Sequence, residues 1–246
     1  MNKIVEICCG SFEDAVNAYN GGAKRIELNS ALHLGGLTPT AATLTLIKQQ
    51  TALEVICMVR PRGAGFCYTK LEQEQMFNEA ENLLKAGADG LAFGFLRNNY
   101  TVDEQLTARM VNLVHKYKKT AVFHRAFDCV NDYKVAIKTL IDLKVDRILT
   151  SGLQAKAITG KEVLKYLQTE FGDKIELLAG SGIKAQNAKS LMEYTGISQV
   201  HSSCKNWRKD VTTVNNKVSY AFAEGNFIDC YDYVDENLVK ELINAI

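Results

Sequence analysis

The chain has 246 residues, of which 47% are hydrophobic and 23% are charged. With 29 basic and 28 acidic side chains the formal net charge is +1, so no general electrostatic field attracts nucleic acid or an anionic membrane, and we expect neither as a partner. The composition is that of a globular protein, and the length suits one (β/α) barrel, which typically takes about 250 residues.

The amino terminus and the cysteines indicate the compartment. Glu6 interrupts the first apolar run before it reaches the length of a signal peptide, and no later run approaches membrane-spanning length. The seven cysteines are scattered without metal-ligand spacing, which is typical of reduced thiols packed as small hydrophobic residues. We therefore expect a cytoplasmic protein.

Eight apolar runs predict strands. Segments with helical periodicity separate them, for example 106–114 and 135–141. Strands that alternate with helices pair in parallel, so we predict a single-domain (β/α)8 TIM barrel over residues 1–246. An open doubly wound sheet is the alternative, but the first turn, 8–12, lacks the glycine pattern of a dinucleotide site. The predicted strands begin near Lys3, Lys24, Leu53, Gly90, Thr120, Asp146, Lys174 and Ser198.

Capping residues mark the helix boundaries. Thr38 before a proline, and Thr101 and Thr159 three residues before a glutamate, predict helix starts. Glycines predict helix ends at 21–22, 87 and 196. Residues 203–234 show no regular pattern and are interpreted as an irregular tail or insertion, after which Asp235 caps a terminal helix, 235–246.

In such a barrel the functional site lies where the carboxyl ends of the strands meet, so the polar residues at the predicted strand ends belong to one mouth. Glu6 and Glu27 lie in apolar surroundings on the first two strands. They are candidates for acid/base catalysis or cation binding, and the alternative is an ion pair with a neighbouring arginine. His124 and Asp128, after the fifth strand, are further candidates for moving a proton.

Several residues at the same ends predict an anion-binding site. Arg60 and Arg62 flank a proline after the third strand, and two guanidinium groups can hold a carboxylate or phosphate, although one of them is expected to pair with Glu6 or Glu27. In this fold the loops after strands 7 and 8 commonly hold phosphate, and otherwise the glycines there only make a tight turn. The other candidates are Arg125, Ser151, Gly180, Ser181, Gly182, His201 and Ser202.

Cys8 is the candidate metal ligand. It adjoins Cys9, and adjacent residues of a strand point to opposite faces, so at most one of the two thiols faces the mouth. Cu(I) favours two or three thiolates, and the other cysteines lie far away in the sequence. From the residues alone, packed thiols are favoured over a copper site.

Taken together, these motifs resemble the CutC copper homeostasis proteins. The resemblance implies a TIM barrel, a cytoplasmic location, self-association into a dimer or larger homo-oligomer, and a part in copper homeostasis through Cu(I) binding. The family's proposed copper site uses a cysteine that matches Cys8 and a second cysteine at a position where this chain has Asn29, which weakens a two-thiolate site. The motifs are Glu6-Ile-Cys8, Arg25-Ile-Glu-Leu28, Gly35-Gly-Leu-Thr-Pro39, Met58-Val-Arg-Pro-Arg-Gly63, Gly87-Ala-Asp-Gly-Leu-Ala-Phe-Gly94, Phe123-His-Arg-Ala-Phe-Asp128, Arg147-Ile-Leu-Thr-Ser-Gly152 and His201-x-Ser203.

Two functional hypotheses follow. The resemblance implies a Cu(I)-binding protein with Cys8 as the ligand. The residues themselves favour a lyase or isomerase that acts on a small anionic or phosphorylated metabolite at the carboxyl-terminal mouth of the barrel.

Overall fold

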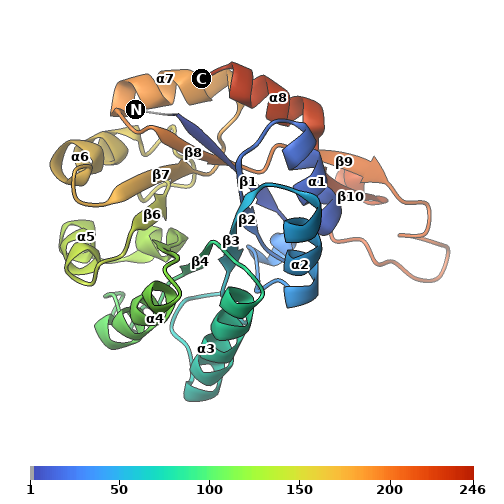
Figure 1. Ribbon diagram of the computed structural model, residues 1–246. Coiled ribbons are helices and arrows are strands. Elements are labelled where there is room, and N and C mark those ends of the chain that lie inside the picture. The colour runs from blue at the N-terminus through green and yellow to red at the C-terminus, as the bar shows by residue number, and fades with distance from the viewer. Residues whose placement is uncertain (1–2) are drawn as a thin grey trace.

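The structure is a computed structural model that describes residues 3–246. Eight parallel strands form a closed barrel in sequence order, and helices surround it (Figure 1). This confirms the predicted (β/α)8 TIM barrel, and every barrel strand begins within two residues of its predicted start. The strands are β1 (Ile4–Cys9), β2 (Arg25–Leu28), β3 (Glu54–Met58), β4 (Gly90–Phe93), β5 (Thr120–Phe123), β6 (Arg147–Thr150), β7 (Glu176–Gly180) and β8 (Gln199–Ser202).

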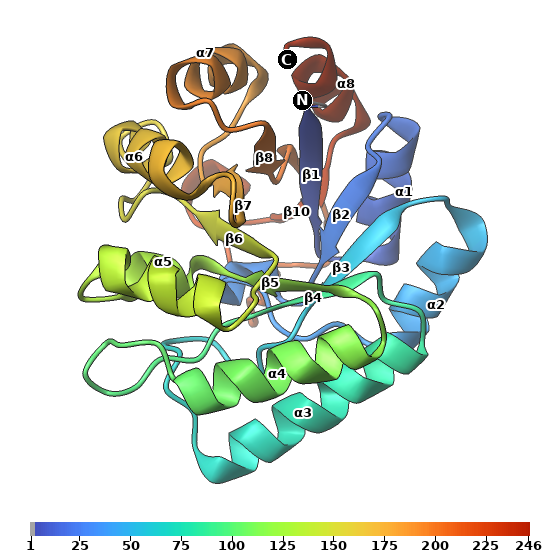
Figure 2. The same cartoon turned by 60° about the vertical axis from the view of Figure 1, so that its left-hand side comes forward.

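Figure 2 shows the helices arranged around the strands, with α3 beside α4 and α7 beside α8. Three short 3-10 helices lie in the loops, namely η1 (Leu32–Leu34), η2 (Arg125–Cys129) and η3 (Gly225–Phe227). The α-helices are α1 (Phe12–Asn20), α2 (Ala41–Gln50), α3 (Lys70–Lys85), α4 (Glu104–Lys116), α5 (Tyr133–Asp142), α6 (Lys161–Phe171), α7 (Ala185–Thr195) and α8 (Glu236–Asn244).

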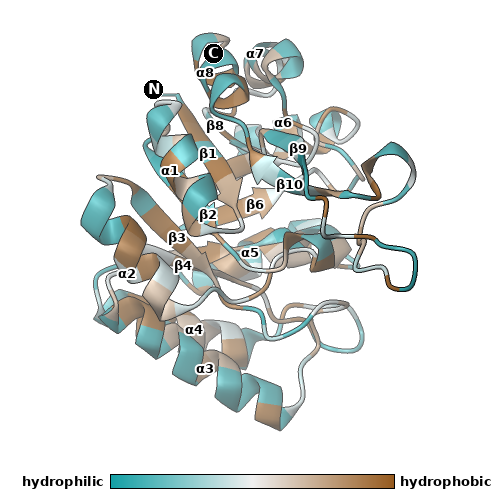
Figure 3. Cartoon of the chain, turned by 90° about the vertical axis from the view of Figure 1, so that its right-hand side faces the viewer, coloured by the Kyte–Doolittle hydropathy of each residue, from teal (hydrophilic) through white to brown (hydrophobic). Residues whose placement is uncertain are grey.

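The alternation of side chains along each strand separates two cores. Ile7 of β1 and Ile26 of β2 belong to the large core between strands and helices, where burial of each such side chain contributes about 1.5 to 3 kcal/mol. Ile56, Met58 and a few neighbours form a smaller cluster of their own. Colouring by hydropathy shows apolar strands and polar helix surfaces (Figure 3).

The predicted helix ends are confirmed, but the three predicted helix starts are wrong by one or two residues. Gly22, Gly87 and Gly196 take positive φ values at the ends of α1, α3 and α7. By contrast, α2 is capped by Thr40, because the Thr38 hydroxyl donates to the carbonyl oxygen of Arg60 and to Glu79. Similarly, α4 is capped by Asp103 rather than Thr101, and α6 begins after Gly160 rather than Thr159.

Residues 203–234 contain structure that the sequence pattern did not predict. β9 (Lys205–Lys209) and β10 (Cys230–Val234) pair antiparallel and extend from the side of the barrel (Figure 1). As predicted, Asp235 caps the last helix, because its side chain accepts from two backbone N–H groups at the start of α8. Within residues 3–246, none of the helices combines the length and the apolar character that crossing a membrane requires.

Candidate functional site

A cluster of three potential metal ligands lies at the ends of β1, β2 and β8. The Cys8 thiol, a carboxylate oxygen of Glu27 and a ring nitrogen of His201 all lie within 4.8 Å of one another. β2 and β8 are the two neighbours of β1 in the barrel, and Cys8 is in register with Glu27. Because side chains alternate, Cys8 faces the mouth while Cys9 packs in the outer core.

The buried ion pair between Glu6 and Arg25 orients the ring of His201. Glu6 Oε1 lies 2.8 Å from His201 Nδ1, and Glu6 Oε2 accepts a hydrogen bond of 2.7 Å from Arg25 Nε. Burial disfavours the ionised form of Glu6, but the hydrogen bond to His201 and the charges of Arg25 and Arg147 outweigh it and lower the pKa of Glu6 to about 2. For Glu6 the structure therefore shows the ion pair with a neighbouring arginine, and that arginine is Arg25.

Glu27 and Asn29 complete the surroundings of Cys8. Burial raises the pKa of Glu27, and the charge of Glu6 adds to this effect. Asn29 Nδ2 donates to Glu27 Oε2 at 2.9 Å and to Cys8 Sγ at 3.5 Å. Position 29 thus adjoins Cys8, so this chain places an amide where a second thiolate would lie.

The donor set of the cluster fits Cu(I) in part, since the carboxylate of Glu27 is a hard ligand that Cu(I) does not favour. A thiolate from Cys8 is the soft ligand that Cu(I) prefers, and imidazole from His201 is a common copper ligand. Met58, whose thioether is also soft, lines the same cavity. The hydrogen bond between Glu6 and His201 matches the carboxylate contact that orients a metal-ligating histidine.

The cluster opens into a cavity of about 140 Å³ in the barrel mouth. The structure brings six of the predicted site residues to its wall, from five different strands or the loops that follow them. Those six residues are Cys8, Glu27, Arg60, His124, Arg125 and His201.

Neither Arg60 nor Arg62 pairs with the glutamates of β1 and β2, so that prediction is wrong. Arg62 forms its ion pair with Glu72 of α3 and is 40% exposed, and it is not among the residues that line the mouth cavity. Arg60 is buried, and its guanidinium group donates to four backbone carbonyl oxygens, those of Leu34, Gly35, Gly36 and Ala64.

Asp128 holds two loops together rather than facing the cavity. Its carboxylate accepts from the hydroxyl of Thr150, from the backbone N–H and hydroxyl of Ser151, from the N–H of Leu153 and from Arg125 Nε. These bonds fasten η2 to the loop after β6. Arg125 and Ser151, both predicted to bind an anion, lie in contact, but their polar groups bond to each other and to Asp128.

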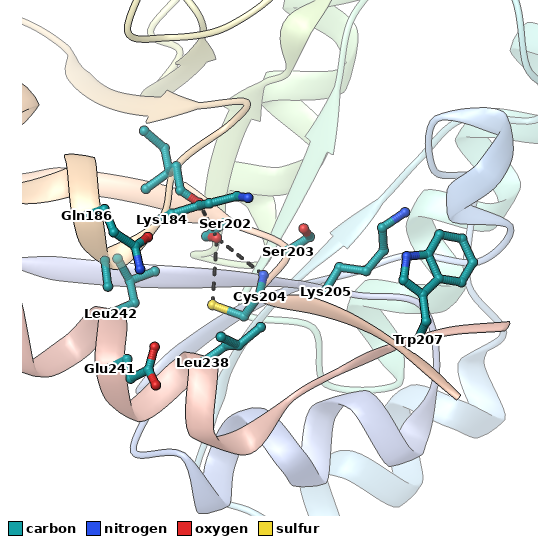
Figure 4. A pocket seen from close by; sticks show the side chains of 12 residues that line it. Lys184, Gln186, Ser202, Ser203, Cys204, Lys205, Trp207, Leu238, Glu241 and Leu242 are labelled. Atoms are coloured by element: carbon teal, nitrogen blue, oxygen red, sulfur yellow. Dashed lines mark hydrogen bonds between the residues drawn. The ribbon is translucent and has the colours of Figure 1, made fainter. Parts of the chain in front are cut away.

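The predicted turn after β7 lies outside the mouth cavity. Ser181 and Gly182 take φ values of +80° and +72°, and the Ser181 hydroxyl donates to the carbonyl oxygen of Ala155. Ser202 lines a different cavity, of about 430 Å³, between the start of α7 and α8 (Figure 4). Its hydroxyl donates to the carbonyl oxygen of Ile183.

The residues predicted for proton transfer and anion binding are thus divided between several places. Glu27, His124 and Arg60 share the cavity, whereas Asp128, Arg62 and the 180–182 turn bond elsewhere. The sequence reasoning missed Arg25 and Met58. Both stand in motifs that were recognised, each two residues before a residue that was chosen, which is the spacing of neighbours on one strand face.

His124 is buried and neutral at the mouth. Its Nδ1 accepts a hydrogen bond of 3.1 Å from the N–H of Ala126, and its Nε2 has no hydrogen-bond partner in the part of the chain that the structure describes. Burial, together with the positive charge of Arg60, lowers the pKa of His124 from 6.5 to about 3.

This pKa shift predicts an acid-sensitive fold. Between pH 6.5 and about 3 the unfolded chain binds a proton at position 124 that the folded chain does not, so stability decreases as the pH falls. We expect a contribution of about 1.4 kcal/mol per pH unit. Urea unfolding between pH 6.5 and about 5 should therefore show a shallower pH dependence for His124→Gln. His33→Gln, at an exposed position, should keep the wild-type slope, and an unchanged slope in His124→Gln would contradict the prediction.

Comparison with known proteins identifies the family. The model of the CutC family matches residues 3–206. A family protein CutC from Treponema denticola is 43% identical over 219 residues, covering 89% of this chain and 88% of that protein. The human copper homeostasis protein cutC homolog is 36% identical over 230 residues, covering 94% of this chain and 82% of its own.

Among solved structures, one is also described as a CutC protein and another shares only the fold. A crystal structure described as a putative copper homeostasis protein CutC from Streptococcus agalactiae superposes with a TM-score of 0.77 at 27% identity, covering 82% of this chain and 98% of that one. Phosphoribosyl anthranilate isomerase from Thermococcus kodakaraensis shares the fold alone, with a TM-score of 0.57 at 13% identity and coverage of 99% and 98%. The family match and the identity to these relatives extend over most of the chain, which therefore belongs to the CutC family.

Proposed function

We propose that this protein acts in copper homeostasis by binding Cu(I) at the cluster of Cys8, Glu27 and His201. The observation that carries the proposal is that ligand atoms from three adjacent strands lie within 4.8 Å of one another. The names of the human and mouse relatives, copper homeostasis protein cutC homologs, support the choice of copper.

Different residues supply the ligand atoms for the ion. Cys8 supplies the thiolate and His201 the imidazole nitrogen that faces away from Glu6, while Met58 offers a thioether from the same cavity. Binding displaces the thiol proton of Cys8. Burial raises the pKa of the Cys8 thiol, so the thiolate forms when the ion displaces the proton. The hydrogen bond from Asn29 to Cys8 Sγ then lies where a second sulfur ligand would be.

The proposal is tested by titrating the fully reduced protein with Cu(I) against a competing chelator. We expect tight binding of one ion per chain, and we expect Cys8→Ser to weaken it by roughly 100-fold or more, because the soft ligand is lost. Cys67→Ser is the matched control, since Cys67 is an exposed thiol that does not line the cavity.

Two results would contradict the proposal. One is weak binding that is indifferent to Cys8→Ser. The other is equal loss in Cys8→Ser and Cys67→Ser, which would show that Cu(I) binds unspecifically to accessible thiols.

The proposal includes a cytoplasmic location. It is supported by the free thiols of all seven cysteines, which suit a reducing compartment. Self-association, and the lack of nucleic-acid and membrane partners, stay predictions.

A further inference from the structure

The cavity at the barrel mouth contains polar groups that neither the fold nor the proposed copper ligands use. It measures about 140 Å³. An engineered cavity of about 150 Å³ in another protein binds benzene, so this volume suits one organic molecule of about six non-hydrogen atoms. The polar groups that line the cavity decide which class of molecule binds there.

Two residues that line the cavity each carry a buried hydrogen-bond donor without a partner among the described residues. Arg60 Nε and His124 Nε2 have no hydrogen-bond partner within residues 3–246, although both side chains are more than nine-tenths buried. Because His124 Nδ1 accepts the N–H of Ala126, the ring hydrogen lies on Nε2, which makes Nε2 a donor. A buried donor without a partner costs about 1 to 3 kcal/mol, which a ligand oxygen would recover.

The charge of the wall favours an anion. The guanidinium group of Arg60 bonds to backbone carbonyl oxygens and forms no ion pair with a described residue. The other charged groups at the mouth have partners. Arg125 pairs with Asp128, and His201 lies against Glu6. Glu27, the carboxyl group on the same wall, accepts from Asn29 and lies within 4.8 Å of a ring nitrogen of His201. One buried positive charge beside one neutral donor matches a single negative charge shared by two oxygens, which is a carboxylate.

The remaining residues that line the cavity indicate the polarity of the rest of the ligand. Leu32, Met58, Phe66 and Leu149 give it an apolar side that suits a short hydrocarbon chain. Asn29 Oδ1 is a buried acceptor without a partner in residues 3–246, so it can accept a hydrogen bond from a ligand hydroxyl.

We propose that the mouth cavity binds a short-chain monocarboxylate, preferably a hydroxy acid, with its carboxylate between Arg60 Nε and His124 Nε2 and its hydroxyl at Asn29. This site shares the cavity, Met58 and Asn29 with the proposed Cu(I) site, but its two donors, on Arg60 and His124, are not among the proposed Cu(I) ligands. It uses two residues chosen from the sequence, His124 and Arg60, as binding groups.

The test is a calorimetric titration of the full chain, reduced and freed of metal, with lactate and with propionate. We expect saturable binding of one molecule per chain, tighter for lactate because propionate lacks the hydroxyl. His124→Phe keeps a ring but removes the donor, and it should weaken lactate binding roughly tenfold or more. His33→Phe, the same change at an exposed position, should bind lactate like the wild type.

A second measurement needs no variant. In wild-type protein with ¹⁵N-labelled histidine, lactate should shift the Nε2–H resonance of His124. The proposal is overturned if neither acid binds, if inorganic phosphate binds and the carboxylates do not, or if His124→Phe binds lactate as tightly as the wild type. Because no metal is present, these results are independent of the Cu(I) titration, so either proposal can fail alone.

Discussion

Replacing Arg25 by methionine should lower the free energy of unfolding by about 3 to 5 kcal/mol, because it leaves the buried Glu6 carboxylate without its arginine partner. Arg25 and Glu6 are each 2% exposed, and Arg25 also donates to Gln199 Oε1 at 2.6 Å. Methionine fills much of the same volume, so the loss reports charge and hydrogen bonding more than packing. Urea unfolding at neutral pH measures it.

The control for this prediction is Arg97→Met, which removes an arginine that is 44% exposed and lies 4.0 Å from Asp103. An exposed pair of this kind contributes at most about 1 kcal/mol. Adding Glu6→Gln to Arg25→Met should recover part of the stability, since the unpaired charge is removed as well. Similar losses for Arg25→Met and Arg97→Met would contradict a buried ion pair.

Asp128→Ala should lower the free energy of unfolding by about 3 kcal/mol or more, because several buried donors lose their acceptor together. The Asp128 side chain is 7% exposed, and among its donors are the hydroxyl of Thr150 at 2.5 Å and the N–H of Ser151 at 3.1 Å. Both Thr150 and Ser151 are fully buried, so water does not replace the carboxylate in the native fold. Urea unfolding measures the loss, and amide hydrogen exchange at Ser151 should accelerate.

Asp132→Ala provides a matched comparison on the same loop. Asp132 caps α5 and accepts from the N–H groups of Lys134 and Val135 at an exposed position. Loss of such a cap typically costs about 1 kcal/mol. If Asp128→Ala were no more destabilising than Asp132→Ala, the network around Asp128 would not hold the loop.

The barrel itself could be predicted because its signals are local. Each strand is a short apolar run, and several helices end at a glycine with a positive φ, such as Gly87. Helix starts were less predictable, since a threonine hydroxyl can form a hydrogen bond to a distant residue instead of capping a helix. Thr38 bonds to Arg60, which lies 22 residues further along the chain, and this contact moved the cap to Thr40.

The candidate site was predictable in part for the same reason. Strand ends of a parallel barrel converge, so Cys8, Glu27 and His201 could be assigned to one mouth without knowledge of their distances. Which of them touch depends on register. The pairing of Glu6 with both Arg25 and His201 follows from β1 lying between β2 and β8, and the closure of the barrel brings residues 6 and 201 together.

The sequence by itself determined the barrel, part of the set of residues at its mouth and the family. Only the tertiary structure decided the partner of each charged group, namely Arg25 rather than Arg60 for Glu6 and Glu72 for Arg62. It also left Arg60 Nε and His124 Nε2, in two residues that line the mouth cavity, without a partner in the described part of the chain. The physical reason is that hydrogen bonds and ion pairs act over a few ångströms, so they depend on the packing of segments that are distant in the chain.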